Sequence, residues 1–520
     1  MTVLKQGQSA DIGLLLEGTY PFVSGGVSSW VNQMIKGFPE HTFALCFIGS
    51  QPSDYGDMRY QLPDNVVHLE VHYLHEPHGK VPVIKRKGNK QVFKEIRCLH
   101  EQYRHADTPK GETASLLKSI MQHRNEGRYA EADFLYSRES WDYITEQYRE
   151  RCTDPSFVDY FWTVRIMHSP LWKLMALTES FIPVKVFHTI STGYAGFLGA
   201  LMKQRTGKPL ILSEHGIYTK ERKIDLFQAE WIRDNRGTLA KDSSEVAYFR
   251  HLWIRFFEAL GRDCYHHADR IIALYETNRL RQIQDGAPAE RTENIPNGIN
   301  FPHLAKVREQ RSDTIPLTIC LIGRVVPIKD IKTFIRAMRT VVNQLPTAEA
   351  WIAGPEDEDP DYAADCRSLV QGLGLSDHVK FLGFQRIDEL LPKVGLLVLS
   401  SISEALPLVI LEGYAAGVPC VSTDVGSCRQ LVEGLGPIDR SIGVSGEIVG
   451  IANPTALANA IVGLLSNPER WYAAQAAGIT RVERYYTQEQ MFSRYRSVYQ
   501  TCLTKSGELT VNASCPRGKH

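Results

Sequence analysis

The sequence predicts an α/β protein with two doubly wound parallel-sheet domains. Three observations support this prediction. The chain has 520 residues, a length typical of several domains rather than one. Short apolar runs alternate with amphipathic helical periods in both halves of the chain. The apolar fraction of 43% is that of an ordinary globular protein with buried cores.

In the second half of the chain, each predicted strand leads into a predicted helix. We expect strands at 316–324, 348–354, 379–384, 396–400 and 419–422. Helices are expected at 331–344, with Asp330 as N-cap, at 362–373 and 387–394, from Pro407 onward, and at 427–433 and 455–465. Because crossovers between parallel strands are right-handed, the strand-to-helix loops should share one sheet edge. Ligands of open α/β sheets bind at that carboxyl edge.

The first half predicts a second sheet of the same type with a large insertion. Strands are expected at 11–16, 42–48, 66–71, 184–188, 210–213 and 270–273, and a helix at 27–36. The charged stretch from about 75 to 154 has helical periodicity and should lie outside the sheet. We therefore expect an N-terminal domain over 1–295 and a C-terminal domain over 296–480. A helix over 481–505 should cross back to the N-terminal domain, and the apolar-poor tail 506–520 should be disordered.

Composition excludes several classes of function. Lys plus Arg number 59 and Asp plus Glu number 59, so nothing indicates a nucleic-acid surface or a polybasic membrane anchor. No apolar run approaches the length of a membrane span, and residues 1–10 lack the apolar core of a secretory signal. The ten cysteines are scattered without a C-x-x-C pair, which favours reduced thiols, a cytoplasmic protein and no metal site.

The stretch S-E-A-L-P-L-V-I-L-E-G at 403–413 is the most informative local pattern. Glu404 lies in the loop after a buried strand, and Glu412 lies on the helix that follows, so the two carboxylates can hold different hydroxyls of one ligand. The free N–H groups at the start of that helix favour an anion such as a diphosphate. An alternative interpretation is that one glutamate serves the helix dipole and the other is solvated.

Two cations accompany this helix start. Arg324 ends a strand and Lys329 opens the next helix, so together they can clamp a diphosphate. The alternative is an ion pair for Arg324 and a solvated Lys329. Gly25 and Gly26 end another strand-to-helix loop and would let backbone approach a phosphate or a sugar, although a plain turn would also use them. This loop does not match the G-x-G-x-x-G dinucleotide fingerprint.

The C-terminal half resembles the family 4 retaining glycosyltransferases of GT-B architecture. The resemblance rests on five ordered motifs: G-R-V-V-P-I-K-D at 323–330, W-I-A-G-P at 351–355, V-K-F-L-G-F at 379–384, S-E-A-L-P-L-V-I-L-E-G at 403–413 and A-G-V-P-C-V-S-T-D-V-G at 416–426. In the N-terminal half, E-G-T-Y-P-F-V-S-G-G-V-S-S-W-V at 17–31 and S-E-H-G-I-Y-T-K-E-R at 213–222 resemble the branch that makes the Pel exopolysaccharide. The resemblance implies two Rossmann-like domains that face each other across a cleft.

The resemblance also implies roles for matching positions. Arg324 and Lys329 would hold the diphosphate of a UDP-sugar, Glu412 the ribose, and Glu404 the donor sugar. His215 would lie near the reacting centre. The remaining donor-binding positions implied are Gly25, Gly26, Gly354, Leu382, Gly383, Phe384, Ala405, Leu406, Pro407 and Leu408; where this chain has Ala405, the family more often has glycine. His188, Glu221 and Arg222 would be acceptor-side residues.

The implied activity is transfer of a hexose or N-acetylhexosamine from a UDP-sugar to a growing polysaccharide, with retention at the anomeric carbon. No metal and no further cofactor is expected, since no D-x-D pair occurs in a suitable loop. The expected partners are the UDP-sugar, a glycan acceptor and an inner-membrane synthase complex. Two alternatives remain: a UDP-sugar epimerase on the same fold, and a non-catalytic assembly subunit.

Overall fold

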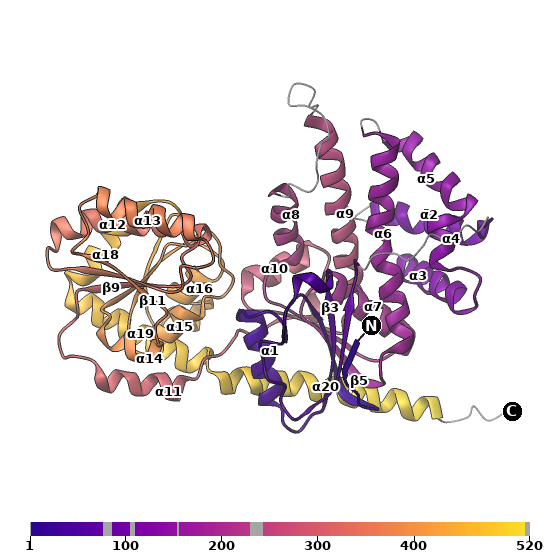
Figure 1. The fold of residues 1–520 in the computed structure, drawn as a ribbon. Coiled ribbons are helices and arrows are strands. Elements are labelled where there is room, and N and C mark those ends of the chain that lie inside the picture. The colour runs from indigo at the N-terminus through magenta and orange to yellow at the C-terminus, as the bar shows by residue number, and fades with distance from the viewer. Residues whose placement is uncertain (1, 76–85, 105–109, 153–154, 229–242, 515–520) are drawn as a thin grey trace. The chain divides into compact units, whose positions relative to one another are not determined.

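The computed structural model describes residues 2–75, 86–104, 110–152, 155–228 and 243–514 (Figure 1). The chain divides into two compact units. Unit 1 comprises Met1–Ala273, Arg279–Glu293 and Arg496–His520, and unit 2 comprises Leu274–Asn278 and Asn294–Tyr495. The main division falls between residues 293 and 294, next to the boundary expected at 295.

Unit 2 contains a six-stranded sheet in the order β11-β10-β9-β12-β13-β14, and all its pairs are parallel. The strands are β9 (Thr318–Ile322), β10 (Glu349–Ala353), β11 (Val379–Gly383), β12 (Leu396–Leu399), β13 (Cys420–Thr423) and β14 (Gly446–Val449). Five of the six match predicted strands. The sixth, β14, was not predicted, because its four residues include only two large apolar side chains.

Helices cover both faces of this sheet (Figure 1). One apolar core contains residues of α12 (Ile331–Gln344), α13 (Pro360–Gly372) and α18 (Pro454–Leu465), and a second contains residues of α11 (Phe301–Lys306), α14 (Ile387–Leu390), α15 (Leu408–Ala415) and α16 (Cys428–Glu433). The remaining helices are α17 (Gly436–Arg440) and α19 (Pro468–Tyr485). The predicted cap of α12 is confirmed, since the Asp330 carboxylate accepts a hydrogen bond from the Thr333 N–H.

Unit 1 contains an eight-stranded sheet in the order β1-β4-β3-β2-β5-β6-β7-β8. The strands are β1 (Thr2–Lys5), β2 (Ala10–Glu17), β3 (Phe43–Gly49), β4 (Val66–Tyr73), β5 (Val184–Thr189), β6 (Leu210–Glu214), β7 (Arg270–Ala273) and β8 (Thr292–Asn294). The pairs from β4 through β7 are parallel, as predicted. The edge strand β1 runs antiparallel to β4 and was not predicted.

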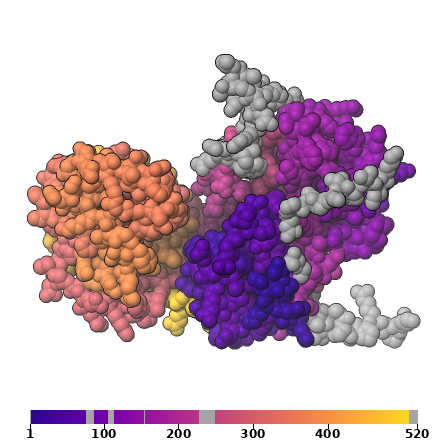
Figure 2. Space-filling model, in the orientation of Figure 1, coloured from indigo at the N-terminus to yellow at the C-terminus, as the bar shows by residue number. Residues whose placement is uncertain are grey.

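The insertion in unit 1 is helical, as predicted, but it extends further. Its helices are α2 (Lys90–Arg104), α3 (Lys110–Asn125), α4 (Glu131–Tyr136), α5 (Arg138–Arg151) and α6 (Phe157–Ser180), so the helical segment ends near residue 180 rather than 154. Parts of the expected stretch, 76–85, 105–109 and 153–154, lie outside the described residues. The violet and magenta atoms of these helices form one body within unit 1 (Figure 2).

The other helices of unit 1 are α1 (Gly26–Gly37), α7 (Tyr194–Thr206), α8 (Tyr218–Gln228), α9 (Ser243–His267) and α10 (Glu276–Gln284), the last of which begins in unit 2. Helix α20 (Gln488–Ser514) begins in unit 2, and from Arg496 onward it belongs to unit 1. The disorder predicted for 506–520 is wrong for residues 506–514, which continue this helix; 515–520 lie outside the described residues. No described helix combines the length and the apolar character that a membrane crossing requires.

Candidate functional site

The loops that follow four neighbouring strands of unit 2 bring the predicted residues to one sheet edge. Arg324 and Lys329 follow β9, Gly354 follows β10, Phe384 follows β11, and Glu404 follows β12. Since these strands are parallel neighbours, their carboxyl ends lie side by side. The structure therefore groups these positions as the strand-loop pattern predicted.

Lys329 and Glu404 form an ion pair at this edge. The Lys329 Nζ atom lies 2.5 Å from Glu404 Oε1, and the hydroxyl of Ser401 donates to the same oxygen at 2.7 Å. Backbone contacts join the two loops, since the Ile402 N–H donates to the Ile328 carbonyl at 2.9 Å. The Ser400 hydroxyl also donates to the Lys329 carbonyl at 2.8 Å. The ammonium and the carboxylate are thus held in one place by the backbone beneath them.

Arg324 lies beside this pair but binds another carboxylate. Its Nη1 atom lies 2.6 Å and 2.5 Å from the two oxygens of Glu358, and both side chains are about half exposed. Gly323, its neighbour, packs against the Lys329 side chain, since a Cβ there would lie 3.4 Å from Lys329 Cε. The guanidinium of Arg324 is therefore in an ion pair, as the alternative interpretation of this residue states, and the two-cation clamp stays a prediction.

Glu412 lies in the second turn of α15 with most of its side chain shielded from water. Burial raises the pKa of its carboxyl group to about 7. Among the described residues, no side chain or backbone group donates a hydrogen bond to this carboxylate. A desolvated, unpartnered carboxyl group next to a ligand-binding sheet edge is a strong candidate for ligand contact.

The loop before α15 is held by the next strand-to-helix turn. A Cβ on Gly426 would lie 2.2 Å from the Glu404 carbonyl oxygen and 2.5 Å from that of Ala405, and the φ of Gly426 is +54°. The Ser427 N–H donates to the Ala405 carbonyl at 2.9 Å. Helix α15 begins at Leu408, one residue after the predicted start, and Pro407 is its N-cap without a side-chain cap. The N–H groups of Leu408 and Val409 thus open the helix.

Two glycines at this edge have a structural explanation. A Cβ on Gly354 would lie 2.0 Å from the Gly323 carbonyl oxygen, so the close approach of two loops requires glycine there. Gly383 has a φ of +62°, which places the end of β11 in the left-handed region. The Leu382 carbonyl accepts from Gln385 Nε2 at 2.7 Å, and Phe384 is 80% exposed.

Unit 1 contains a cavity of about 380 Å³ at the carboxyl ends of β2 and β6. His215 lines it, and burial lowers the pKa of its imidazole to about 4, so the ring is neutral at pH 7. The ring packs edge-on against Trp30, 4.6 Å between centroids, and its Nε2 has no hydrogen-bond partner among the described residues. His215 is therefore positioned by packing, with a nitrogen left for other contacts.

Glu214, next to His215, is fully buried and satisfied by four donors. Its carboxylate accepts from Tyr265 at 2.7 Å, Thr192 at 3.0 Å, Gln282 at 3.1 Å and the Tyr218 N–H at 3.1 Å. Burial raises the pKa of its carboxyl group, although these hydrogen bonds oppose the shift. Glu214 lies within the motif at 213–222, but no role was predicted for it. Its hydrogen bonds fix the loop that bears His215.

A second network in the cavity joins Glu17, Tyr218 and Arg222. The Tyr218 hydroxyl donates to Glu17 Oε1 at 2.9 Å, and Arg222 Nη2 donates to the Tyr218 oxygen at 3.2 Å. Glu221 also lines the cavity, where burial raises the pKa of its carboxyl group. A Cβ on Gly216 would lie 1.9 Å from Glu221 Oε1, so the carboxylate lies directly over that backbone. Glu17, like Glu214, was missed because only the fold shows its partners.

Three predicted residues of unit 1, His188, Gly25 and Gly26, do not line this cavity. His188 is fully buried, with Nδ1 2.8 Å from the Tyr499 hydroxyl and Nε2 2.9 Å from the Ser213 hydroxyl, and it does not line the cavity. His188 is thus packed in the interior of unit 1, and its acceptor-side role stays a prediction. Gly25 and Gly26 are exposed, and a Cβ on either would meet nothing within 4 Å, so the fold of unit 1 does not itself require glycine there.

Two family models match this chain. Residues 10–290, more than half of the chain, match the family described as "Domain of unknown function (DUF3492)", and residues 316–467 match the family described as "Glycosyl transferases group 1". The fold, with two Rossmann-like domains, is that of the GT-B glycosyltransferases. The chain belongs to the DUF3492 family, and residues 316–467 of its second half match the group 1 glycosyl transferases.

Characterised relatives are distant. The chain is 34% identical over 160 residues to an exopolysaccharide phosphotransferase of Streptomyces coelicolor, covering 30% of this chain and 16% of that protein. It is 27% identical over 330 residues to a D-inositol 3-phosphate glycosyltransferase of Thermobispora bispora, covering 60% and 69%. For three of the curated relatives the match spans 45%, 16% and 55% of their own lengths. The structure of Anabaena HepE in complex with UDP has a similar fold, with a TM-score of 0.56, 15% identity, and coverage of 94% of this chain and 100% of that one.

Proposed function

We propose that this protein is a retaining glycosyltransferase, PelF-like, that transfers a hexose or N-acetylhexosamine from a UDP-sugar to a growing exopolysaccharide of the Pel type. The observation that supports this proposal most strongly is the state of Glu412. Its carboxyl group is desolvated, has a raised pKa and lacks a hydrogen-bond donor among the described residues. Two ribose hydroxyls supply the donors that such a group needs.

The diphosphate of the donor would bind beside Glu412. Lys329 has three N–H donors, and its contact with Glu404 uses one of them. The ion pair of Arg324 with Glu358 is exposed, and pairs of this kind contribute only about 0–1 kcal/mol, so a diphosphate can take the guanidinium at little cost. The N–H groups of Leu408 and Val409, at the N-terminus of α15, would donate hydrogen bonds to the same diphosphate.

Glu404 would orient the donor sugar. Its Oε1 already accepts from Lys329 and Ser401, and within the described part of the chain Oε2 has no hydrogen-bond donor. This second oxygen is available to hydroxyl groups of the sugar ring. The Gly426 turn holds the Glu404 and Ala405 backbone in place, so the carboxylate is presented from a fixed loop.

The base of the nucleotide would bind at the end of β11. The left-handed conformation of Gly383 turns the chain there, and Phe384 presents an exposed aromatic face. Stacking on such a face accepts any base. The backbone of residues 382–384 would supply the hydrogen bonds that favour uracil.

The chemistry depends on charge that develops as the sugar–phosphate bond breaks. Negative charge grows on the departing diphosphate, where Lys329, Arg324 and the α15 N-terminus would stabilise it. In a retaining reaction of this kind, the leaving phosphate accepts the proton of the acceptor hydroxyl on the same face. His215, which is neutral at pH 7, would position the reacting groups without adding a charge. No step in this scheme requires a metal ion.

The cavity of unit 1 would receive the acceptor. Its lining includes Glu221 and Arg222, and Arg222 is held in place by Tyr218 and by the face of Phe257, 5.0 Å from the ring centroid. Carboxylates and a guanidinium are suitable partners for sugar hydroxyls. At about 380 Å³ the cavity falls in the size range of pockets for small ligands, which is compatible with the terminal residue of a glycan.

We also propose a cytoplasmic enzyme that docks to an inner-membrane synthase through its helical segment. Helix α6 exposes Val158, Trp162 and Ile166, which recur every four residues and form one apolar stripe. Trp141 of α5 is also exposed and packs near this stripe, with its ring 5.6 Å from that of Phe161. An exposed apolar stripe of this kind is typical of a surface that binds another protein.

The proposed function is tested by incubating the purified protein with a panel of UDP-sugars, with and without glycan acceptors. UDP release that requires acceptor supports the transferase. Isomerisation of the sugar without UDP release would indicate the epimerase instead. If no UDP-sugar turns over and UDP does not shift thermal unfolding, the protein is an assembly subunit and the proposal is wrong.

The docking surface is tested with the triple variant V158S/W162S/I166S. We expect turnover with a soluble acceptor to stay unchanged and co-sedimentation with membranes that contain the synthase to be lost. The triple variant D361S/D365S/S368A, on exposed residues of α13, is the control and should still co-sediment. Unchanged co-sedimentation of the stripe variant would exclude this surface.

A further inference from the structure

Two neighbouring strands of unit 1 place four potential metal ligands on one face of the sheet. His68, Glu70 and His72 alternate along β4, so their side chains point to the same side. Cys46 of β3 pairs directly with Glu70 in the parallel register, which brings its thiol to that side as well. This arrangement is outside the cavity described above, which none of the four residues lines.

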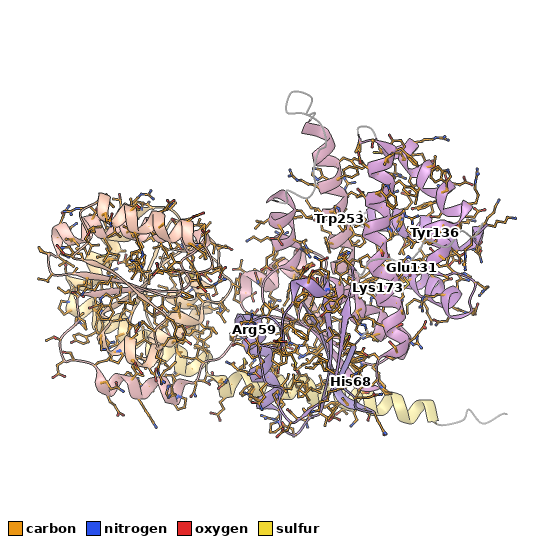
Figure 3. All side chains as sticks on the ribbon, viewed as in Figure 1. Arg59, His68, Glu131, Tyr136, Lys173 and Trp253 are labelled. Atoms are coloured by element: carbon orange, nitrogen blue, oxygen red, sulfur yellow. The ribbon has the colours of Figure 1, made fainter. Side chains whose placement is uncertain are left out.

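Three of these side chains meet in the interior. Cys46 Sγ, a Glu70 carboxylate oxygen and a His72 ring nitrogen all lie within 4.8 Å of one another. Cys46 is 0% exposed, Glu70 1% and His72 8%, so the cluster is sealed from bulk water. Helix α6 packs over the end of β4, where Lys173 Nζ donates to the Tyr73 carbonyl at 2.8 Å; Figure 3 labels Lys173 and His68.

The polar atoms of this cluster do not satisfy one another. His72 Nε2 lies 3.2 Å from Glu70 Oε1, yet the ring N–H direction does not point at the oxygen, and neither atom has a hydrogen-bond partner among the described residues. A buried carboxylate oxygen without a donor is costly, because water no longer solvates it. Lone pairs that converge without a proton between them are typical of atoms that share a cation.

His68 has a different part in the cluster. Its Nδ1 accepts a hydrogen bond from the Gly7 N–H at 3.3 Å, which leaves the ring proton on Nε2 in the neutral form. That nitrogen lies 3.6 Å from Glu70 Oε2. At this distance the two atoms make no hydrogen bond, but a small movement of either side chain would let His68 donate to the second carboxylate oxygen, as outer residues of metal sites commonly do.

We propose that Cys46, Glu70 and His72 bind a zinc ion, with His68 orienting Glu70. A thiolate and an imidazole select a borderline-soft divalent ion over Mg²⁺ or Ca²⁺. Charge balance agrees with zinc, because one thiolate, one carboxylate and one neutral imidazole cancel the two positive charges. On binding, the proton of the Cys46 thiol is released to solvent. Small side-chain rotations bring the three atoms to the bond lengths of about 2.0–2.3 Å that zinc requires.

The ion would join β3 to β4 beneath the helical segment. Both strands lie toward one edge of the sheet, where β4 is followed only by the short strand β1. The site belongs to the interior core that contains Cys46 and residues of α6 and α7. Its role is therefore to stabilise unit 1 rather than to act on the sugar donor. The sequence did not indicate it, because zinc-motif spacing is absent when ligands come from two strands.

The first experiment measures the metal content of the full chain, purified without an affinity tag and without chelators. Mass spectrometry of the metals should find about one zinc per chain. The variants Cys46→Ala and His72→Gln should each lose at least about nine-tenths of it. Cys320→Ala and His378→Gln are matched controls from the strands and turns of unit 2, and they should keep the metal. Wild-type protein without zinc, even after incubation with Zn²⁺ and dialysis, would overturn the proposal.

Cobalt substitution gives a second readout that does not depend on a variant folding. Wild-type protein depleted of metal and reloaded with Co²⁺ should show the thiolate-to-cobalt charge-transfer band of a cysteine ligand. Absence of this band, or its persistence in Cys46→Ala, would show that Cys46 is not a ligand. Removal of zinc should also lower the thermal midpoint of unit 1 while UDP binding is retained. Loss of UDP binding without a change in that midpoint would contradict the stabilising role of the metal.

Discussion

Replacing Glu412 by glutamine should stabilise unit 2 and, at the same time, weaken its binding of UDP. In the folded protein, burial raises the pKa of this carboxyl group from 4.5 to about 7. Folding therefore takes up a proton between these two pH values. Above pH 7 the group is ionised in both states, and the folded state has the cost of a desolvated charge.

The expected change in the free energy of unfolding follows from the shift in the pKa of Glu412. A change from 4.5 to about 7 corresponds to about 3 kcal/mol of lost stability above pH 7, at about 1.4 kcal/mol per unit. Glutamine resembles the protonated acid, so Glu412→Gln should regain up to about 3 kcal/mol at pH 8. At pH 5, where the folded wild type is already protonated, the gain should fall below about 1 kcal/mol.

Thermal unfolding at pH 5 and pH 8 measures this difference. Because a chain with two units unfolds in more than one step, the relevant transition is the one that UDP shifts upward. For a unit of this size, about 3 kcal/mol raises the midpoint by roughly 6–12 °C. Glu483→Gln, the same change at an exposed position of α19, is the control and should shift little at either pH.

Calorimetric titration should show that Glu412→Gln binds UDP more weakly than the wild type, although the variant is more stable. Loss of a charged acceptor for the ribose should cost roughly 1.5–3 kcal/mol at pH 8, a weakening of about 10- to 150-fold. The affinity of the wild type should fall as the pH decreases through 7, whereas that of the variant should be flat. Equal midpoints at pH 8 together with equal affinities would refute the placement of Glu412 in the site.

Three further changes test other parts of the site. Lys329→Ala should lower kcat by roughly 100- to 1000-fold through lost stabilisation of the leaving group. Lys332→Ala is the control, since this α12 lysine pairs with Asp365, and it should not lower kcat. A wild-type kcat in Lys329→Ala would remove Lys329 from the mechanism. His215→Asn should lower kcat while the UDP affinity stays unchanged. The dependence of kcat on pH above pH 5 should keep its shape, because this imidazole is already neutral there. A lost alkaline or acidic limb of that profile would contradict the neutral state. Gly426→Ala should abolish UDP binding in calorimetry by displacing the Glu404 carbonyl, and full affinity would show that the loop can move aside.

Most of the sheet architecture was predictable from local patterns. Apolar runs such as 379–384 and 396–400 became β11 and β12 within a residue or two, because buried parallel strands consist of nearly continuous apolar residues. Strands with little apolar content were missed. β1 has two exposed apolar side chains, Val3 and Leu4, and pairs only at the sheet edge, so no burial pattern marks it.

The end of the chain was misjudged for a related reason. Residues 506–514 have little apolar content, which predicted disorder, yet they continue a helix whose earlier turns pack through Tyr499 and Cys502. A helix that is anchored at one end can continue into polar sequence. The composition of residues 506–514 alone does not predict the packing of the earlier turns of this helix.

The site was predictable where one segment holds several functional residues and not where partners come from distant segments. The spacing within 403–413 predicted Glu404 and Glu412 as candidate site residues, and the fold places both at or next to the sheet edge. Glu17 and Glu214 gained their roles from tyrosines and a glutamine far along the chain. His188 is the opposite case. Its position at a strand end predicted a functional role, whereas the fold places the Tyr499 and Ser213 hydroxyls at its two ring nitrogens.

The route of α20 has a consequence for synthesis of the protein. The last helix supplies Tyr499 to His188, so the unit that contains the first residues of the chain also needs some of the last. The ribosome must therefore release nearly the whole polypeptide before that unit can complete its interior, whereas unit 2 has all its strands earlier. A premature stop near residue 495 would damage the amino-terminal half of the protein, far from the lesion in the message.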